Sequence, residues 1–575
     1  MKFKHKYFDN KCILNFSEEY VCDAQSLLTC DAFIELFDKY LTYAKENKYD
    51  IYKYLLEASD NDIEKMTHDC LLLYKLLLVM DAEEVSVDYP NLRPYLCDLR
   101  ILLRVVEGVY FYWRRLQRYC IISNSEHKTG LEDAAFLESQ ENFQRLILDT
   151  YRQLERSLGH ENNVYRQIIA GVNAALSLNE GSIKLPSPYE ELNKLSVVER
   201  VTIHPPFITY SKQNTRDGVF NEVFENPILD KNFDEDEWYC YPIRVGSLVA
   251  FVYFHEKFMN QGVSLCNLFS MAEKSDYDGR NPDLVFVFGC EDVEPRQCFY
   301  HDKENNIMVG YITQDDKYDY FGYMKKMILT LHNLVMINND KLPVHGAMVE
   351  ISFKSGEKKT IVIMGDSGAG KSETIEQIKA LGKKHINEIK TVYDDMGVLY
   401  IRDDGKVVSS GTEIGAFVRL DDLETGVGYR EVDRSVFMNP DKVNARIVTP
   451  MSFWRDIVAD YKIDYFLYAN NYEDSDDVLG FFDDADSAIE VFRSGKRMTK
   501  GTTTEKGIST SFFANPFGPC QRQEQCEKLL DKYFNLMMEQ GVKLGQIRTR
   551  LGVSGYEKNG PKLAARELFD NMTNK

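Results

Sequence analysis

The sequence predicts an α+β protein with three parts: an α-helical N-terminal region (residues 1–185), a mixed α/β substrate-side domain (residues 186–335) and a nucleotide-binding, kinase-like domain with a phosphate-binding loop, or P-loop (residues 336–575). Three observations lead to this prediction. Apolar residues recur at three- and four-residue spacing in the first part. Short apolar runs alternate with helical patterns in the rest, and one run ends in a glycine-rich loop that leads into a helix.

The N-terminal region shows helical periodicity and contains little proline or glycine. Its histidines stand apart in the sequence, and no metal-ligand or nucleophile pattern emerges. We interpret the region as a helical bundle that packs, mediates protein contacts or supports oligomerisation. The predicted helices cover residues 32–44, 62–80, 96–120, 141–158 and 163–178.

The mixed domain begins in a stretch that is rich in turn-forming proline, residues 185–236. Residues 240–253 (CYPIRVGSLVAFVY) predict a strand that runs into a helix. Residues 282–289 (PDLVFVFG) and 307–312 predict two buried strands, and residues 327–336 predict a helix.

The strongest signal is the loop GDSGAGKS at residues 365–372, which fits the phosphate-binding pattern G-x-x-x-x-G-K-[ST]. The apolar run IVIM before it predicts a strand, and a helical pattern follows to about residue 381. Lys371 is expected to reach the outer phosphates of ATP, and the hydroxyl of Ser372 to bind Mg²⁺. The predicted nucleotide-binding residues are Gly365, Asp366, Ser367, Gly368, Ala369, Gly370, Lys371, Ser372 and Glu373.

Polar residues flank this loop in the sequence. His345 lies on a predicted strand, where a lone histidine is more often structural than a ligand. Asp394 and Asp395 follow an apolar segment, as the second Mg²⁺ contact of a phosphate-binding site does. Arg446 lies among apolar residues, which favours an anion beside it. Residues 493–518, rich in Gly, Thr and Lys, are either a flexible loop or a nucleotide contact.

The composition narrows the class of partner. The net charge is −21 and the pI is about 5.1, which argues against nucleic acid or an anionic membrane as the main partner. The longest apolar run, residues 71–80, is too short to span a bilayer. The 12 cysteines form no CxxC pair and are expected to be reduced and buried. We expect a cytoplasmic protein.

Several of these stretches resemble ATP-type phosphoenolpyruvate carboxykinase in order and approximate spacing, over about residues 200–575. The loop, with VHGAMVEI upstream of it, also resembles HPr kinase/phosphorylase, which shares this core fold. The matching stretches are residues 243–259 with 282–289, YFGYMKK with residues 342–349, GDSGAGKS, GTEIGAF (411–417) with NAR (444–446), and residues 492–513.

The resemblance implies a fold and a set of roles. The fold would be a two-domain carboxykinase-like core with a C-terminal P-loop domain. Lys326, His345 and Asp395 would bind Mn²⁺, and a neutral lysine ligand requires a lowered pKa. The other implied roles are phosphoryl stabilisation by Arg446, nucleotide contact by Lys506, and substrate contact by Lys325, Tyr320 and Gly322.

The sequence also departs from this pattern. Phe321 replaces one of the paired glycines at the family's substrate site. The arginine that grips the substrate carboxylate has two candidates. Arg216 lies in a suitable region with a poor local match, and Arg280 has a better local match but falls too late in the order.

The function we expect is ATP-dependent phosphoryl transfer with Mg²⁺ and Mn²⁺. The specific expectation is that oxaloacetate loses CO₂ and the enolate oxygen takes the γ-phosphoryl group. An alternative is a kinase, similar to HPr kinase, that acts on another small-molecule or protein hydroxyl with Asp394 or Asp395 as base. A third possibility is a nucleotide-binding regulatory protein. The catalytic residues would be Lys371, Arg446, Asp394, Asp395 and Lys325.

Overall fold

The computed structural model describes residues 4–17, 20–124, 130–159, 167–179, 183–366, 368–382, 385–423, 426–499, 507–557 and 559–573. The chain forms two compact units. The first unit contains Met1–Glu180 and Val198–Phe207, and the second contains Gly181–Val197 and Ile208–Lys575. The protein combines helices and strands, with a helical N-terminal region, as the sequence predicts.

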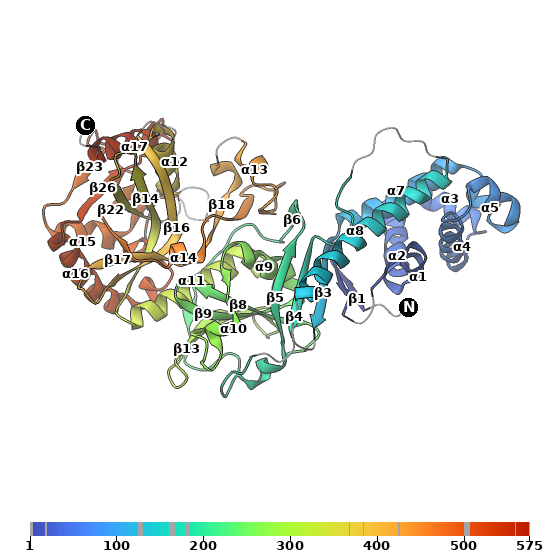
Figure 1. Ribbon diagram of the computed structural model, residues 1–575, viewed down its shortest axis with the longest axis horizontal. Helices are drawn as coiled ribbons and strands as arrows, with labels where there is room; N and C mark the ends of the chain where they lie inside the picture. The colour runs from blue at the N-terminus through green and yellow to red at the C-terminus, as the bar shows by residue number, and fades with distance from the viewer. Residues whose placement is uncertain are drawn as a thin grey trace. The chain divides into compact units, whose positions relative to one another are not determined.

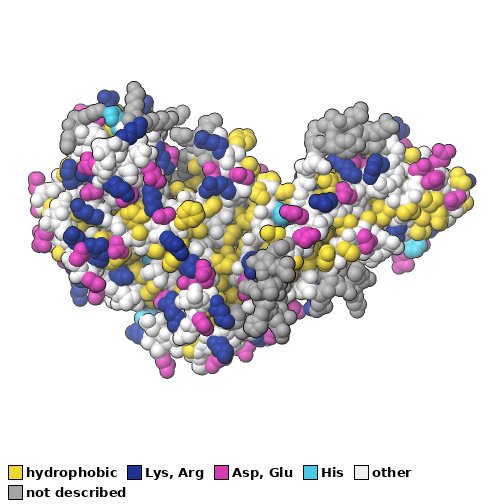
Figure 2. Space-filling model, viewed as in Figure 1, with side chains coloured by type: hydrophobic (Ala, Val, Ile, Leu, Met, Phe, Trp, Pro, Cys, Tyr) yellow, Lys and Arg dark blue, Asp and Glu magenta, His cyan; other side chains and the backbone are white. Residues whose placement is uncertain are grey.

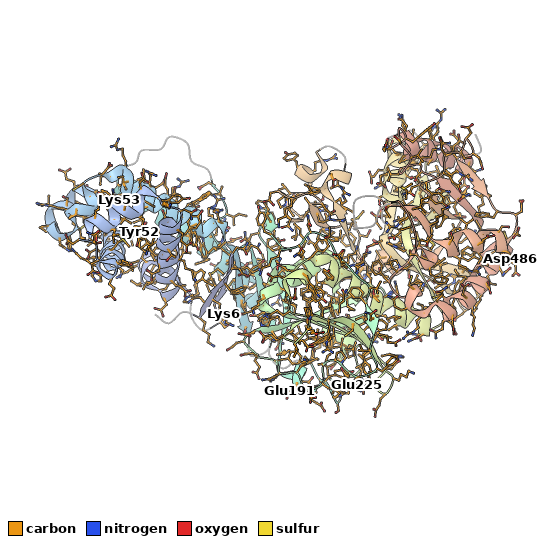
Figure 3. All side chains as sticks on the ribbon, turned by 180° about the vertical axis from the view of Figure 1, so that it is seen from behind. Lys6, Tyr52, Lys53, Glu191, Glu225 and Asp486 are labelled. Atoms are coloured by element: carbon orange, nitrogen blue, oxygen red, sulfur yellow. The ribbon has the colours of Figure 1, made fainter. Side chains whose placement is uncertain are left out.

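The first unit is built around a cluster of helices with one apolar core (Figure 1). Several of them begin at an aspartate whose carboxylate accepts a hydrogen bond from a backbone N–H of the first turn, as Asp62, Asp81 and Asp98 do. The partly buried Tyr52 and exposed Lys53 mark α3 in the reverse view (Figure 3). The helices are α1 (Ala24–Thr29), α2 (Asp31–Glu46), α3 (Asp50–Ala58), α4 (Ile63–Leu76), α5 (Ala82–Asp88), α6 (Arg93–Leu96), α7 (Leu99–Arg115) and α8 (Gly130–Ser157).

Strands also contribute to the first unit, which corrects two predicted helices. The predicted helix over residues 96–120 ends at Arg115, and β3 (Gln117–Asn124) follows. The predicted helix over residues 163–178 is wrong, because its last residues belong to β4 (Ala174–Asn179), whose first five side chains are all buried. A strand buried on both faces has no alternation, so its pattern does not separate it from a helix. β3 pairs in parallel with β4 and with β2 (Lys11–Asn15), and β2 pairs with β1 (His5–Phe8).

The second unit begins with strands around a buried antiparallel pair, β8 (Trp238–Val245) and β9 (Leu248–His255). The predicted helix after the first of these strands is therefore wrong. The chain turns at Gly246, whose positive φ of 57° suits the first position of a two-residue hairpin loop. β11 (Leu284–Cys290) pairs in parallel with β9 on one side and with β13 (Ile307–Thr313) on the other. The two strands predicted at residues 282–289 and 307–312 are therefore confirmed.

Shorter elements complete this part of the second unit. They are β7 (Asn221–Glu222), β10 (Ser270–Met271), β12 (Gln297–Asp302), α9 (Met259–Ser264), α10 (Lys274–Tyr277) and α11 (Phe321–Asn338). Two further strands are divided between the units. The first two residues of β5 (Ser196–Ile203) belong to the second unit and pair with β8, and the rest of β5 belongs to the first unit. In β6 (Phe207–Thr209), Phe207 belongs to the first unit and the last two residues to the second.

A separate sheet of eight strands carries the glycine-rich loop. Its order is β21-β17-β16-β14-β15-β22-β26-β23, and β15, β22 and β26 are parallel. One face packs on α12 (Lys371–Leu381) and α17 (Asn559–Met572), and the other on α15 (Ala485–Ser494) and α16 (Gln523–Glu539) (Figure 1). The exposed Asp486 marks α15 in Figure 3. The strands are β14 (Leu342–Phe353), β15 (Lys358–Met364), β16 (Ile386–Ile401), β17 (Val407–Gly411), β21 (Tyr461–Lys462), β22 (Tyr465–Asn470), β23 (Leu479–Phe481) and β26 (Lys543–Arg548).

A small sheet, in which β20 (Arg446–Pro450) pairs with β18 (Gly415–Arg419) and β19 (Val436–Met438), also belongs to the second unit. The remaining elements are α13 (Val427–Arg430), α14 (Trp454–Ile457) and the strand pair β24 (Lys496–Met498) and β25 (Ile508–Thr510).

Among the described residues, no helix combines the length and the apolar character that crossing a membrane requires.

Candidate functional site

The glycine-rich loop, residues 365–372, joins β15 to α12 in the second unit, so the strand and the helix predicted around it are confirmed. Two neighbouring side chains hold the loop's carbonyls. Asn471 Nδ2 donates to the Gly368 carbonyl at 2.9 Å, and Thr549 Oγ1 donates to the Ala369 carbonyl at 2.7 Å. Gly370, the N-cap of α12, has no side chain that could cap the helix, which suits an anion at this helix start.

Gly370 is needed for two independent reasons. Its φ is +92°, a region that L-residues rarely adopt. A Cβ at this position would also lie 2.7 Å from the side chain of Thr549. The loop therefore folds closely against the end of β26, and only glycine fits there.

Lys371 and Ser372 begin α12 and point toward different partners. The Lys371 ammonium donates to the Asp366 carbonyl at 3.1 Å. The Ser372 hydroxyl donates to Asp394 Oδ1 at 2.9 Å, which brings the loop together with an acid on β16. A hydroxyl and a carboxylate oxygen at this distance can share one Mg²⁺.

Asp395 is the centre of a buried charged cluster. Lys325 Nζ and Lys326 Nζ lie 2.5 and 2.7 Å from its Oδ2, and His345 Nε2 lies 2.9 Å from its Oδ1. Burial opposes ionisation of the carboxyl, but the charges of Lys325 and Lys326 outweigh it and hold the pKa of Asp395 well below its usual range. Burial and the neighbouring Lys325 lower the pKa of Lys326, against the opposing effect of Asp395.

Glu413 is a second buried acid of this cluster, on the side of Lys325. Its carboxylate lies 3.3 Å from Lys325 Nζ and makes no hydrogen bond within the described part of the chain. Burial raises the pKa of Glu413 to about 7, against the opposing effect of Lys325. The sequence places Glu413 in the GTEIGAF stretch but assigns it no role.

The donor set around Asp395 fits a divalent cation. His345 Nδ1 lies 2.8 Å from the Ala514 carbonyl, which can only accept, so Nδ1 carries the proton. Burial lowers the pKa of His345, which favours the neutral ring, and the Nε2 lone pair then faces a carboxylate oxygen. A cation bound between them would relieve that repulsion. The carboxylate is a ligand type that Mn²⁺ accepts, whereas an imidazole is more typical of Zn²⁺, Cu²⁺, Fe²⁺ or Ni²⁺. Among the described residues, no group of three or more His, Cys, Asp or Glu gathers as a metal site, and this set depends on Lys326 as its third donor.

Residues of the glycine-rich loop, together with Asp394, Asp395, Lys326 and His345, line one cavity of about 1420 Å³, wholly within the second unit. Figure 2 shows acidic and basic side chains intermixed over the face of this unit that is in view, without one large patch of either sign. The structure brings most of the predicted site residues to the cavity: Arg216, Tyr320, Gly322, Lys326, His345, Asp366, Gly368, Gly370, Lys371, Ser372, Glu373, Asp394, Asp395 and Arg446.

Arg446 lies on β20 with its guanidinium 5.3 Å from the ring centre of Phe417. Its Nε is buried and has no hydrogen-bond partner in the described part of the protein. A buried donor without a partner is costly, so this group is available to an oxyanion in the cavity.

Phe517, which the sequence does not single out, lines the cavity and contacts three of its basic side chains. Its ring centre lies 4.5 Å from Lys326 Nζ and 5.1 Å from the Arg216 guanidinium, and it meets the His345 ring edge-on at 6.0 Å. An aromatic face can hold cations apart from one another without neutralising them.

Other predicted residues lie elsewhere. Phe321 is buried against Phe417, with ring centres 5.2 Å apart, and does not line the cavity. Lys325 is buried behind Asp395 rather than facing the cavity, so its predicted contact with substrate is not seen. Arg280 lies 3.8 Å from Asp283, away from the cavity, which leaves Arg216 as the carboxylate-binding candidate. Ser367 and Lys506 lie outside the described residues.

Comparison of the chain with known protein families and with curated proteins finds no match.

Proposed function

We propose that the second unit transfers the γ-phosphoryl group of ATP to an acceptor bound in the same cavity. One observation carries this proposal: residues of the glycine-rich loop line the same cavity as the Ser372–Asp394 pair, as Asp395 with its neighbours Lys326 and His345, and as Arg446. Nucleotide phosphates, two divalent cations and an acceptor can thus meet without a large movement of the chain.

The loop would bind the phosphates, and Lys371 would exchange the Asp366 carbonyl for a phosphate oxygen. Ser372 and Asp394 would hold Mg²⁺, and Lys326, His345 and Asp395 would hold Mn²⁺. Bound there, the two cations would supply charge neutralisation for the transferring group and polarisation of the acceptor. Arg446 would donate to the equatorial oxygens of that group through its Nε, which has no hydrogen-bond partner among the residues that the structure describes.

The acceptor we propose is a small carboxylate, with oxaloacetate as the specific candidate. Arg216 lies at the cavity with its guanidinium supported by Phe220 and Phe517, at 5.3 and 5.1 Å from the ring centres. A planar, charged fork in this position suits a carboxylate. The benzyl group of Phe321, which would narrow the substrate site if it faced inward, packs on Phe417 instead.

A second candidate, a kinase for a hydroxyl group, is favoured by one feature of the acids. Asp395 is held ionised by Lys325 and Lys326 and would be a weak base. Among the described residues, the side chain of Asp394 is hydrogen-bonded to the Ser372 hydroxyl alone. Asp394 could therefore accept the proton of an attacking hydroxyl.

A coupled assay separates these possibilities. Purified protein with ATP, Mg²⁺, Mn²⁺ and oxaloacetate should yield phosphoenolpyruvate. Lys371→Ala should abolish the product, while Lys462→Ala, which removes an exposed lysine of the same unit, should leave it unchanged. ADP release that depends on Lys371 only with other acceptors would favour the kinase. Nucleotide binding without turnover for any acceptor would contradict the proposal and favour a regulatory protein.

A further inference from the structure

The glycine-rich loop contains an acid at the place where phosphates are expected to bind. Asp366 follows Gly365, lines the cavity and is 8% exposed. A carboxylate beside a nucleotide triphosphate repels it, and the repulsion is strong where water is scarce. The loop can bind phosphate well only if this charge is compensated.

Arg497 supplies that compensation. Its Nε lies 3.0 Å from Asp366 Oδ2, and both side chains are buried. The other carboxylate oxygen, Oδ1, lies 3.5 Å from His345 Nδ1. Asp366 thus lies between a guanidinium and the imidazole of the Asp395 cluster.

The strand that carries Arg497 is fastened to the loop by a second set of contacts. Asn471 accepts a hydrogen bond from Met498 N at 2.8 Å and donates to the Met498 carbonyl at 2.8 Å. The same Nδ2 donates to the Gly368 carbonyl at 2.9 Å. β24 and the loop therefore hold a fixed position relative to one another, which keeps Arg497 on Asp366.

We propose that Arg497 is a positioning residue for nucleotide binding, which acts by neutralising Asp366 and holding the loop open to phosphate. The inference rests on the proposed function, since it takes ATP as the ligand of the loop. Without Arg497, Asp366 loses the guanidinium that lies 3.0 Å from its Oδ2, beside the expected phosphates. Without Asp366, the loop no longer carries the charge that Arg497 is proposed to neutralise.

The test is a set of ATP–Mg²⁺ titrations of the full chain by calorimetry. Arg497→Gln should weaken binding by about tenfold or more, and Arg497→Lys should recover part of the loss. Asp366→Asn should bind at least as tightly as the unchanged protein. The double variant Asp366→Asn/Arg497→Gln should return to within about threefold of Asp366→Asn.

Several outcomes would overturn the inference. One is Arg497→Gln binding as tightly as the unchanged protein while Lys371→Ala does not bind. Another is a double variant as weak as Arg497→Gln, which would mean that Arg497 acts on the nucleotide itself. If Arg497→Gln does not fold, the test is the ATP–Mg²⁺ affinity of the double variant compared with that of Asp366→Asn. Lys371→Ala binding like the unchanged protein would instead count against the proposed function.

Discussion

At the scale of single residues, the second unit places two adjacent carboxylates in opposite surroundings. Asp394 accepts one hydrogen bond from a serine, whereas Asp395 lies within 3 Å of two lysines and a histidine. Residues that alternate along a strand point to opposite sides of it. This explains how neighbours on β16 can serve two different sites around one cavity.

The contrast predicts unequal effects on stability. Asp395→Asn leaves Lys325 and Lys326 close together without their shared counter-charge, so we expect a loss of about 3–5 kcal/mol in the free energy of unfolding. Asp394→Asn removes one hydrogen-bond acceptor and should cost about 1 kcal/mol. Urea unfolding of the two variants measures both. Equal losses would contradict the central role of Asp395.

Glu413 gives the protein a dependence on pH. Its pKa is raised from 4.5 to about 7 in the folded protein, so the folded state keeps a proton that the unfolded chain has released. This contribution to stability is complete below 4.5 and is lost as the pH rises through about 7.

Glu413→Gln cannot take up or release this proton. We expect the variant to lose less stability than the unchanged protein as the pH rises from 4.5 to about 7. Denaturant midpoints across this range provide the measurement, and Asp236→Asn, at an exposed acid, is the control. Parallel curves for Glu413→Gln and the unchanged protein would refute the assignment.

At the scale of elements, the turn from β15 to α12 depends on close contact as well as on backbone freedom. Gly370 and Gly356 both have φ near +90°, but only Gly370 has a neighbour within 4 Å. We expect Gly370→Ala to weaken the affinity for ATP by more than about tenfold, because the added Cβ would force the loop away from Thr549. Gly356→Ala is the control, because it introduces a similar backbone strain without a close contact, and it should bind ATP with the affinity of the unchanged protein. Similar affinities for the two variants would show that contact with Thr549 is unimportant.

The sequence predicts some of these elements and not others, for identifiable reasons. The strand at IVIM and the helix after GDSGAGKS are found as predicted. The phosphate-binding loop pattern is typically preceded by a strand and followed by a helix, so it predicts both elements. The sequence does not predict the turn at Gly246 or the strand that begins at Ala174. In both places the apolar residues form continuous buried runs, whose spacing does not distinguish a strand from a helix. It also assigns no role to Phe517, Arg497 and Glu413, because each acts through a partner far away in sequence.

At the scale of the whole molecule, the apolar cores follow the two units. One core contains side chains of the first unit alone, and the others contain side chains of the second. A ligand of the second unit binds its folded state directly and should stabilise that core by about 2.7 kcal/mol at a concentration 100 times Kd.

Calorimetry can detect this separation. We expect two thermal transitions, of which ATP with Mg²⁺ raises only the one that belongs to the second unit. Lys371→Ala should remove the shift and leave the other transition in place. A single transition that shifts as a whole would mean that the two cores unfold together.

The division of the chain also limits how the gene could be rearranged. Val198–Phe207 belongs to the first unit although the segments on both sides of it belong to the second. There His204 N donates to the Asn173 carbonyl at 2.8 Å, and His204 Nε2 lies 2.9 Å from Gln140 Oε1. Deleting the coding sequence for residues 1–180 would leave this returning segment without those partners. The first unit is therefore encoded by two separate stretches of the gene. Replacing this unit by another domain would require replacing residues 198–207 as well as residues 1–180.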